Sequence, residues 1–217
     1  MKVVLISPPD ERPNEVVTVE SLFASGLEHY HLRKPGWKSA QVALWLESMP
    51  ARWRGRIVLH SHADLAPCFR VGGIHFRDDG EAPEDPAFRV PAGCLTSRSC
   101  HDLAGARAAL GRYDSIFFSP VFRSLSKPGY GPAPRHVLDE LRAVLAARTP
   151  TERRTKVFAL GGVTAQHLHD CHSLGFDGVA ILGAVWNAAD PVAAFLEFHS
   201  ACGRQADPTS DDRGSLP

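Results

Sequence analysis

The chain has 217 residues, of which 44% are hydrophobic, and its 24 basic residues balance its 24 acidic ones. This length fits one domain with a sizeable core, and the balanced charge gives no reason to expect nucleic acid or an anionic membrane as a partner. The five cysteines include no CxxC pair, which argues against a disulfide framework or a structural zinc site and predicts a reducing, cytoplasmic setting.

The chain opens with a short apolar run, residues 3–6, which Pro8 and Pro9 stop. This run is too short for a signal peptide or a membrane span, so it predicts a buried first strand. Later runs rich in β-branched and aromatic residues predict further buried parallel strands, at residues 29–33, 56–60, 73–76, 93–97, 115–119, 156–160 and 178–182. Helical patterns alternate with them, at residues 16–24, 39–47, 102–110, 134–147, 165–174 and 191–201.

The flanking residues support these helices and one long loop. Ser39 and Thr164 stand where N-caps belong, and Pro134 and Pro191 suit a first helical turn. The stretch 77–91 is rich in Asp, Glu, Pro and Gly and predicts a loop.

Strands that alternate with helices over this length predict an α/β fold, a single-domain (β/α)₈ TIM barrel. An open doubly wound sheet is the alternative. We expect the barrel to span residues 1–203 and the polar tail, residues 204–217, to be disordered.

Two glycine sites predict a place for phosphate. Gly161 and Gly162 follow the seventh predicted strand and precede a helix, and Gly183 follows the eighth. The loops after these two strands commonly bind phosphate in such barrels, because glycine exposes amide N–H groups and a helix N-terminus favours anions. The alternative is that the paired glycines only make a tight turn.

Histidines and cations stand at the carboxyl ends of several other strands. His31 and Arg33 alternate onto one face of the second strand, where an inward arginine favours an anionic ligand. His60 ends the third strand, His75 lies in the fourth and His101 follows the fifth. Four histidines at one rim indicate general acid/base chemistry, although each alone is more often a structural residue.

The segment after the sixth strand and the His/Asp residues near the third and fourth strands each have a structural and a functional interpretation. The segment 123–131 contains hydroxyls, glycines and Lys127, which suits a lid that grips an anion. His60 and His62 form only a weak metal-ligand pattern. Asp78 and Asp79 are better explained as a solvent-exposed pair in a loop than as a metal site.

Several motifs occur together in one order and give the chain a family resemblance. They are Leu32-Arg33-Lys34, Ala63-Asp64-Leu65-Ala66, Gly73-Ile74-His75, Ser97-Arg98-Ser99-Cys100-His101, Ser119-Pro120-Val121-Phe122 with Ser126-Lys127, Leu160-Gly161-Gly162-Val163-Thr164 and Gly178-Val179-Ala180-Ile181. The chain resembles the thiamine phosphate synthase family, including its TenI-type thiazole tautomerase branch, from about residue 5 to residue 199.

The resemblance implies roles for individual residues. Arg33 and Lys127 would grip phosphate oxygens, and Ser99 and His60 would lie near the ligand. The glycines at 161, 162 and 183 would hold a thiazole phosphate. Ser124 and Ser126 take the place of the synthases' paired threonines.

The sequence also departs from the synthase pattern, and these departures separate the two branches. Synthases carry Gln where His31 stands and Asn-Asp where His60 and Ser61 stand, and that Asp binds magnesium. Asp78 or Asp79 matches the second metal Asp only with a gap. The tautomerase branch carries a His at position 31 and lacks the metal pair.

We therefore favour a tautomerase-like isomerase that uses His101 and His31 as catalytic residues and needs no cofactor. The alternative is the synthase, a transferase that uses Mg²⁺ to join hydroxymethylpyrimidine diphosphate to thiazole phosphate. A non-catalytic regulator is a further alternative, and a metal hydrolase is the least favoured. The expected partners are these small molecules, without nucleic acid or membrane, and assembly into a homo-oligomer is left open.

Overall fold

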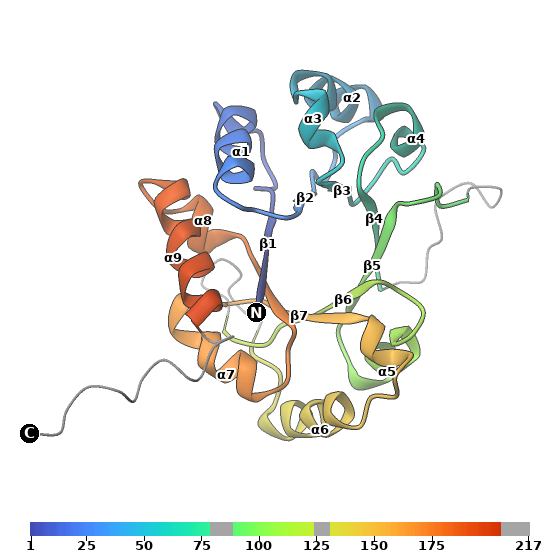
Figure 1. The fold of residues 1–217 in the computed structure, drawn as a ribbon, viewed down its shortest axis with the longest axis vertical. Helices are drawn as coiled ribbons and strands as arrows, with labels where there is room; N and C mark the ends of the chain where they lie inside the picture. Colours follow the sequence, from blue (N-terminus) through green and yellow to red (C-terminus); the bar gives the residue numbers. More distant parts are fainter. Residues whose placement is uncertain (79–88, 124–130, 205–217) are drawn as a thin grey trace, which may run out of the picture.

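The chain folds into a closed barrel of parallel strands with helices around the outside (Figure 1). The structure, a computed structural model, describes residues 1–78, 89–123 and 131–204. The strands are β1 (Lys2–Ile6), β2 (Tyr30–Leu32), β3 (Ile57–Leu59), β4 (Gly73–Phe76), β5 (Leu95–Cys100), β6 (Ser115–Phe118), β7 (Lys156–Leu160) and β8 (Gly178–Ile181). Each strand pairs with the next, and β8 pairs with β1, with Lys2 opposite Gly178. The predicted (β/α)₈ barrel is confirmed, and the open sheet was the wrong alternative.

The helices cover the outer surface of the barrel. They are α1 (Glu15–Ala24), α2 (Ser39–Ser48), α3 (Ala51–Arg54), α4 (Leu65–Phe69), α5 (Leu103–Ala109), α6 (Arg135–Ala146), α7 (Leu168–Ser173), α8 (Gly183–Trp186) and α9 (Pro191–Arg204), with 3₁₀ turns η1 (Glu152–Arg154) and η2 (Ala165–His167). The predicted helix at 165–174 is thus divided between η2 and α7. Helices α3, α4 and α8 were not predicted, because four or five residues are too few to show a helical period.

The fifth strand differs from its prediction in a way that matters for the site. We predicted residues 93–97, but β5 runs from Leu95 to Cys100. Its polar segment continues the ladder, with Ser97 opposite His75 in β4 and Cys100 opposite Phe118 in β6. A hydroxyl on the inner face of this strand finds a partner in His75, so the polar residues need not end the strand.

Two apolar layers stabilise the barrel. The larger one lies between the strands and the helices and includes Leu5, Tyr30, Ile116 and Trp186. The smaller one fills the inside of the barrel and consists of Val4, Ile6, Phe117, Phe158 and Ala180.

A hollow opens at the amino ends of the strands, which we call the base. Its volume is about 260 Å³, and His31, Phe117 and Phe158 line its inner part. The interior layer therefore lies between this hollow and the opposite end of the barrel, which we call the mouth.

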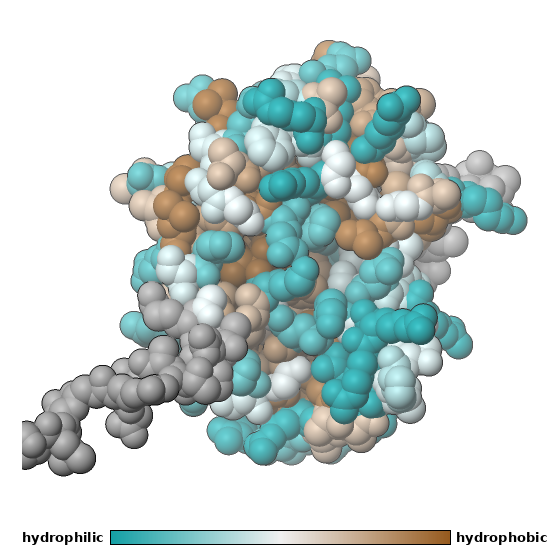
Figure 2. All heavy atoms as spheres, in the orientation of Figure 1, coloured by the Kyte–Doolittle hydropathy of each residue, from teal (hydrophilic) through white to brown (hydrophobic). Residues whose placement is uncertain are grey.

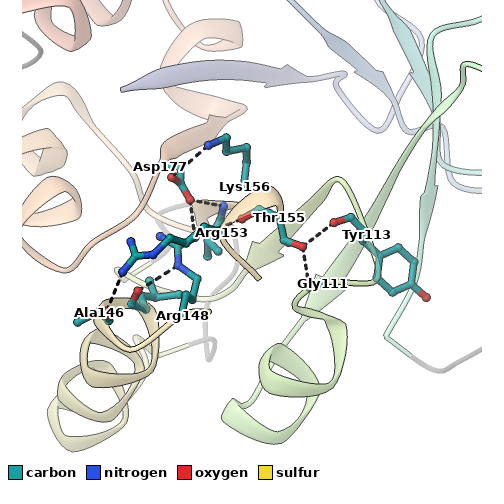
Figure 3. A network of polar contacts seen from close by, with 10 residues as sticks. Gly111, Tyr113, Ala146, Arg148, Arg153, Thr155, Lys156 and Asp177 are labelled. Atoms are coloured by element: carbon teal, nitrogen blue, oxygen red, sulfur yellow. Dashed lines mark hydrogen bonds and ion pairs between the residues drawn. The ribbon is translucent and has the colours of Figure 1, made fainter. Parts of the chain in front are cut away.

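A polar network fixes the base where β7 and β8 begin (Figure 3). Arg148, at the end of α6, donates to Asp177 before β8 across 2.9 Å, and both side chains are largely shielded from solvent. Thr155, before β7, donates to the carbonyl of Tyr113 at 2.6 Å and accepts from the amide of Gly111 at 2.9 Å. These contacts tie three loops together at the base.

The face of the molecule in Figure 2 is mostly covered by hydrophilic residues, with hydrophobic residues between them. Among the described residues, the large hydrophobic side chains that are exposed lie on separate elements: Val17, Leu44, Val90, Leu95 and Leu196. Apolar residues scattered in this way are ordinary for a protein surface. Within the described ranges, no helix has the length and apolar character to cross a bilayer.

Candidate active site

Three histidines from neighbouring strands meet inside the barrel. His31 lies in β2, His60 directly follows β3 and His75 lies in β4. The His31 Nδ1 and His60 Nε2 atoms are 3.0 Å apart, and the rings of His60 and His75 stack with centroids 4.0 Å apart. The His31 and His75 rings both contact Phe117 of the interior layer, at 4.7 and 5.0 Å between centroids. We call these three residues the imidazole cluster.

Two serines of β5 hold His75. Ser97 and Ser99 alternate onto the inner face of the strand, and their Oγ atoms lie 2.8 Å from Nδ1 and Nε2 of His75. A neutral imidazole has one N–H donor and one acceptor, so one hydroxyl accepts from the ring and the other donates to it. Ser99 was a predicted ligand contact, whereas Ser97 was missed, although it precedes Ser99 by two residues and shares its face.

Burial keeps the imidazole cluster uncharged. Desolvation is the main cause that lowers the pKa of His31 and His60 well below 6.5, and the neighbouring histidines add to it. Desolvation and the charge of Arg33 lower the pKa of His75 to about 3. These rings are therefore weak bases at neutral pH, which counts against the predicted catalytic role of His31.

His101 differs from the other three histidines. It follows β5 and is exposed, and its Nδ1 lies 2.9 Å from the carbonyl oxygen of Ser119. A carbonyl only accepts, so Nδ1 carries the proton and the neutral ring has its lone pair on Nε2. His101 lines a hollow of about 670 Å³ with Leu103, Pro120 and Val137. His101 is thus set up as a proton donor or acceptor, beside a hollow that none of the cluster residues lines.

Arg33 and Lys34 point to opposite sides of the barrel wall. The Ser7 hydroxyl bonds both to the amide and to the carbonyl of Arg33, at 2.8 Å each, and the exposed side chain places its charge near His60 and His75. Lys34 is buried and forms a 2.5 Å ion pair with Glu15 of α1. Lys34 is therefore part of the outer layer, and Arg33 directs its charge toward the imidazole cluster.

The paired glycines allow two loops to approach each other closely. Gly161 and Gly162 have φ values of 94° and 66°. A Cβ atom would lie 3.0 Å from the Pro120 Cα at position 161 and 2.5 Å from the Arg123 carbonyl oxygen at position 162. In the described part of the chain, their amide N–H groups donate to no backbone carbonyl. The turn is therefore tight, as the alternative interpretation held, and among the described residues no backbone carbonyl competes with an anion for its amides.

The remaining predicted phosphate contacts have mixed outcomes. Gly183 begins α8, next to the end of β8. Ser124, Ser126 and Lys127 lie outside the described residues, as does Asp79. The predicted lid at 123–131 is described only at its two ends, Arg123 and Gly131.

The carboxylate and imidazole groups do not form a magnesium site in the described residues. Asp78 pairs with Arg98, with Oδ1 and Nη2 3.6 Å apart, and the Arg98 guanidinium lies over the ring of Tyr113. That direction leads away from the inner face of β5. Mg²⁺ requires oxygen ligands, and the imidazole cluster offers nitrogen. The weak metal prediction for Asp78 is therefore not supported, and we derive no reaction step through Mg²⁺.

The His60–His62 metal pair also does not form. His62 has a φ of 54°, and its Nε2 lies 2.8 Å from the carbonyl of Trp37. His60 instead meets histidines from two other strands.

Comparisons with known proteins agree with this architecture. A sequence model of the thiamine monophosphate synthase family (TMP-TENI) matches residues 3–185. A thiamine-phosphate synthase of Methylobacillus flagellatus is 29% identical over 201 residues, which cover 89% of this chain and 91% of that protein. One of Mycolicibacterium gilvum is 33% identical over 198 residues, which cover 85% and 80%.

Solved structures show the same fold. A thiamine phosphate pyrophosphorylase of Bacteroides thetaiotaomicron has a TM-score of 0.74 at 26% identity and covers 94% of this chain and 98% of its own. The corresponding protein of Pyrococcus furiosus has a TM-score of 0.75 at 18% identity, with coverage of 94% and 96%.

Proposed function

Because the chain belongs to the thiamine monophosphate synthase family, we propose that it is a thiamine-biosynthesis enzyme whose barrel mouth binds a thiazole phosphate. The relatives are named for the synthase reaction. These names favour the synthase, which was the alternative, over the tautomerase that the sequence favoured. The first candidate is therefore the transfer of a hydroxymethylpyrimidine group from its diphosphate to the thiazole phosphate, with release of diphosphate.

The glycine turn supports phosphate binding. Among the described residues, the amides of Gly161 and Gly162 donate to no backbone carbonyl, and both glycines have positive φ values. Gly183 begins a helix at the neighbouring strand end. Amide N–H groups grouped in this way bind phosphate oxygens without a full charge.

The charge of the departing diphosphate needs a cation. Arg33 is an exposed arginine whose charge acts on two histidines of the imidazole cluster, and a guanidinium forms two parallel hydrogen bonds with a phosphate group. We assign it the diphosphate, as the resemblance implies. Lys127 keeps the same predicted role.

The synthase proposal is tested by mixing purified protein with both substrates, with and without Mg²⁺, and measuring thiamine phosphate. We expect product from the wild-type protein and a raised KM for the diphosphate in Arg33→Gln. Arg135→Gln, on exposed α6, is the matched control and should behave as wild type. Absence of thiamine phosphate under every condition would refute the synthase assignment.

The geometry of His101 favours a second candidate, the tautomerase. A bond from Nδ1 to the Ser119 carbonyl leaves Nε2 available to take a proton from a thiazole ring and return it at another atom. Isomerisation of a thiazole phosphate by the same sample, without the diphosphate substrate, would support this candidate. Binding of thiazole phosphate with no turnover in either assay would instead support a regulator.

We also propose a reducing, cytoplasmic location, because all five cysteines are free thiols. A redox-sensitive reporter fused to the chain would test this location in cells. Measurement of the mass in solution would establish whether the barrel is a monomer or a homo-oligomer.

A further inference from the structure

We propose that the imidazole cluster binds one transition-metal dication of the zinc type, with a fourth coordination position open toward the mouth. This site is separate from the magnesium chemistry of the family, because its ligands are nitrogen atoms. The proposal rests on the convergence of three rings from three adjacent strands.

The distances require only a small contraction of the cluster. One nitrogen atom from each of His31, His60 and His75 lies within 4.8 Å of the others, and one pair is already at 3.0 Å. Zn–N bonds of about 2.0 Å at tetrahedral angles place the ligand nitrogens about 3.3 Å apart. The widest separation must therefore shrink by at most about 1.5 Å, which ring rotations and small backbone shifts can supply.

The donor set selects the metal. Imidazole nitrogen is a ligand for Zn²⁺, Co²⁺ and Ni²⁺, whereas Mg²⁺ and Ca²⁺ take oxygen ligands. Three protein ligands and one open position are the arrangement of catalytic zinc sites, and a closed structural site has four. His60 is the half-buried member, so it marks the side from which the ion and its fourth ligand would enter.

The surrounding hydrogen bonds already orient one ligand. Ser97 holds Nδ1 of His75, as an outer partner holds a metal-bound imidazole. Coordination through Nε2 releases the Ser99 hydroxyl, which then lies beside the metal. One of the two nitrogens in the His31–His60 hydrogen bond carries a proton, and a nitrogen that binds a metal cannot keep it. This proton moves to the other nitrogen of the same ring, so both imidazoles stay neutral when the ion binds.

Two arginines shape what else the site accepts. Arg33 and Arg77 both place positive charge near His60, and Arg33 also near His75. A bare dication is disfavoured by these charges, so the fourth ligand is expected to be an anion such as hydroxide, carboxylate or phosphate.

The test is metal uptake by the full chain after removal of metals with a chelator. Equilibrium dialysis against Zn²⁺ should give one tightly bound ion per chain. Co²⁺ should give the visible spectrum of a tetrahedral site without a thiolate charge-transfer band, which separates the cluster from the free cysteines.

Variants then assign the ligands. His60→Gln should weaken Zn²⁺ affinity by more than about 100-fold, and Ser97→Ala by roughly 10- to 100-fold. His169→Gln, an exposed histidine of α7, should bind as wild type does. Circular dichroism checks that each variant is folded. If His60→Gln does not fold, His31→Gln, which removes another ligand of the cluster, takes its place in the affinity measurement. No stoichiometric uptake by the wild type, a thiolate band with Co²⁺, or unchanged affinity in folded His60→Gln would overturn the proposal.

Discussion

Replacing Gly162 with alanine tests whether the glycine turn is required for the approach of the neighbouring loop. Residue 162 has a φ of 66°, and an added Cβ would lie 2.5 Å from the carbonyl oxygen of Arg123. Gly36 is the matched control, because its φ is 80° and an added Cβ meets no atom within 4 Å. Both substitutions strain the backbone, and only the first creates a collision.

The structure gives the size of the difference. A positive φ costs an alanine about 1–2 kcal/mol, which applies to both variants. Relieving the collision at position 162 requires a shift of the Arg123 backbone, at about 1–3 kcal/mol for an overpacked site. Gly162→Ala should therefore lose about 2 kcal/mol more than Gly36→Ala, or about 4–8 °C in melting temperature for a domain of this size.

Thermal unfolding followed by circular dichroism measures this difference, and calorimetry with thiazole phosphate measures binding. Gly162→Ala should also bind the ligand more weakly, because the shifted turn moves its amides. Equal melting temperatures for the two variants would show that the approach of residue 123 is not required, and the reasoning from the turn would fail.

Three other predictions concern catalysis, the base and acid sensitivity. His101→Ala should lower isomerase turnover by about 10²- to 10⁴-fold with little change in ligand affinity. The control His136→Ala, on exposed α6, should have no effect. Equal turnover of His101→Ala and the wild type in a kinetic assay would show that His101 takes no part in the mechanism. Asp177→Ala should cost about 2–3 kcal/mol in urea unfolding, because the buried Arg148 guanidinium loses its counterion and keeps only its bonds to carbonyls. Arg135→Ala breaks an exposed pair and should cost less than about 0.5 kcal/mol, so similar costs would contradict the role of the base network. In metal-free buffer, unfolding free energy should fall by about 1.4 kcal/mol per histidine of the imidazole cluster between about pH 7.5 and about pH 5.5. The unfolding free energy falls on acidification because the pKa values of the three histidines in the folded protein lie below 6.5, so protons bind first to the unfolded chain. This contribution is present above pH 6.5 and is lost as the pH falls. An unfolding free energy that does not change with pH in this range would contradict the burial of the cluster.

The sequence predicted the barrel because each strand is a short buried run that a helix follows. Alternation along β2 also placed His31 and Arg33 on one face. The structure confirms that placement, since His31 contacts Phe117 inside the barrel and Lys34 pairs with Glu15 outside. Local pattern was sufficient there because period-two alternation fixes the side of every residue in a strand.

Contacts between distant segments could not be predicted in this way. The partner of His75 is Ser97, which lies beyond a long loop and was expected to end the strand. The glycine turn owes its shape to residues 120–123, which no local pattern relates to it. The direction of Asp78 depends on Arg98 of the next strand. In each case the deciding interaction is between strands, and a single sequence shows only order along the chain.

The interior layer has a consequence for what can pass along the barrel axis. His31 and Phe117 both line the hollow at the base, and the Phe117 ring contacts His31 and His75 of the imidazole cluster. His31 is therefore both a member of the cluster and part of the lining of this hollow. A side chain smaller than phenylalanine at position 117 would enlarge the hollow beside the cluster, so solvent entering from the base would come closer to the imidazole rings.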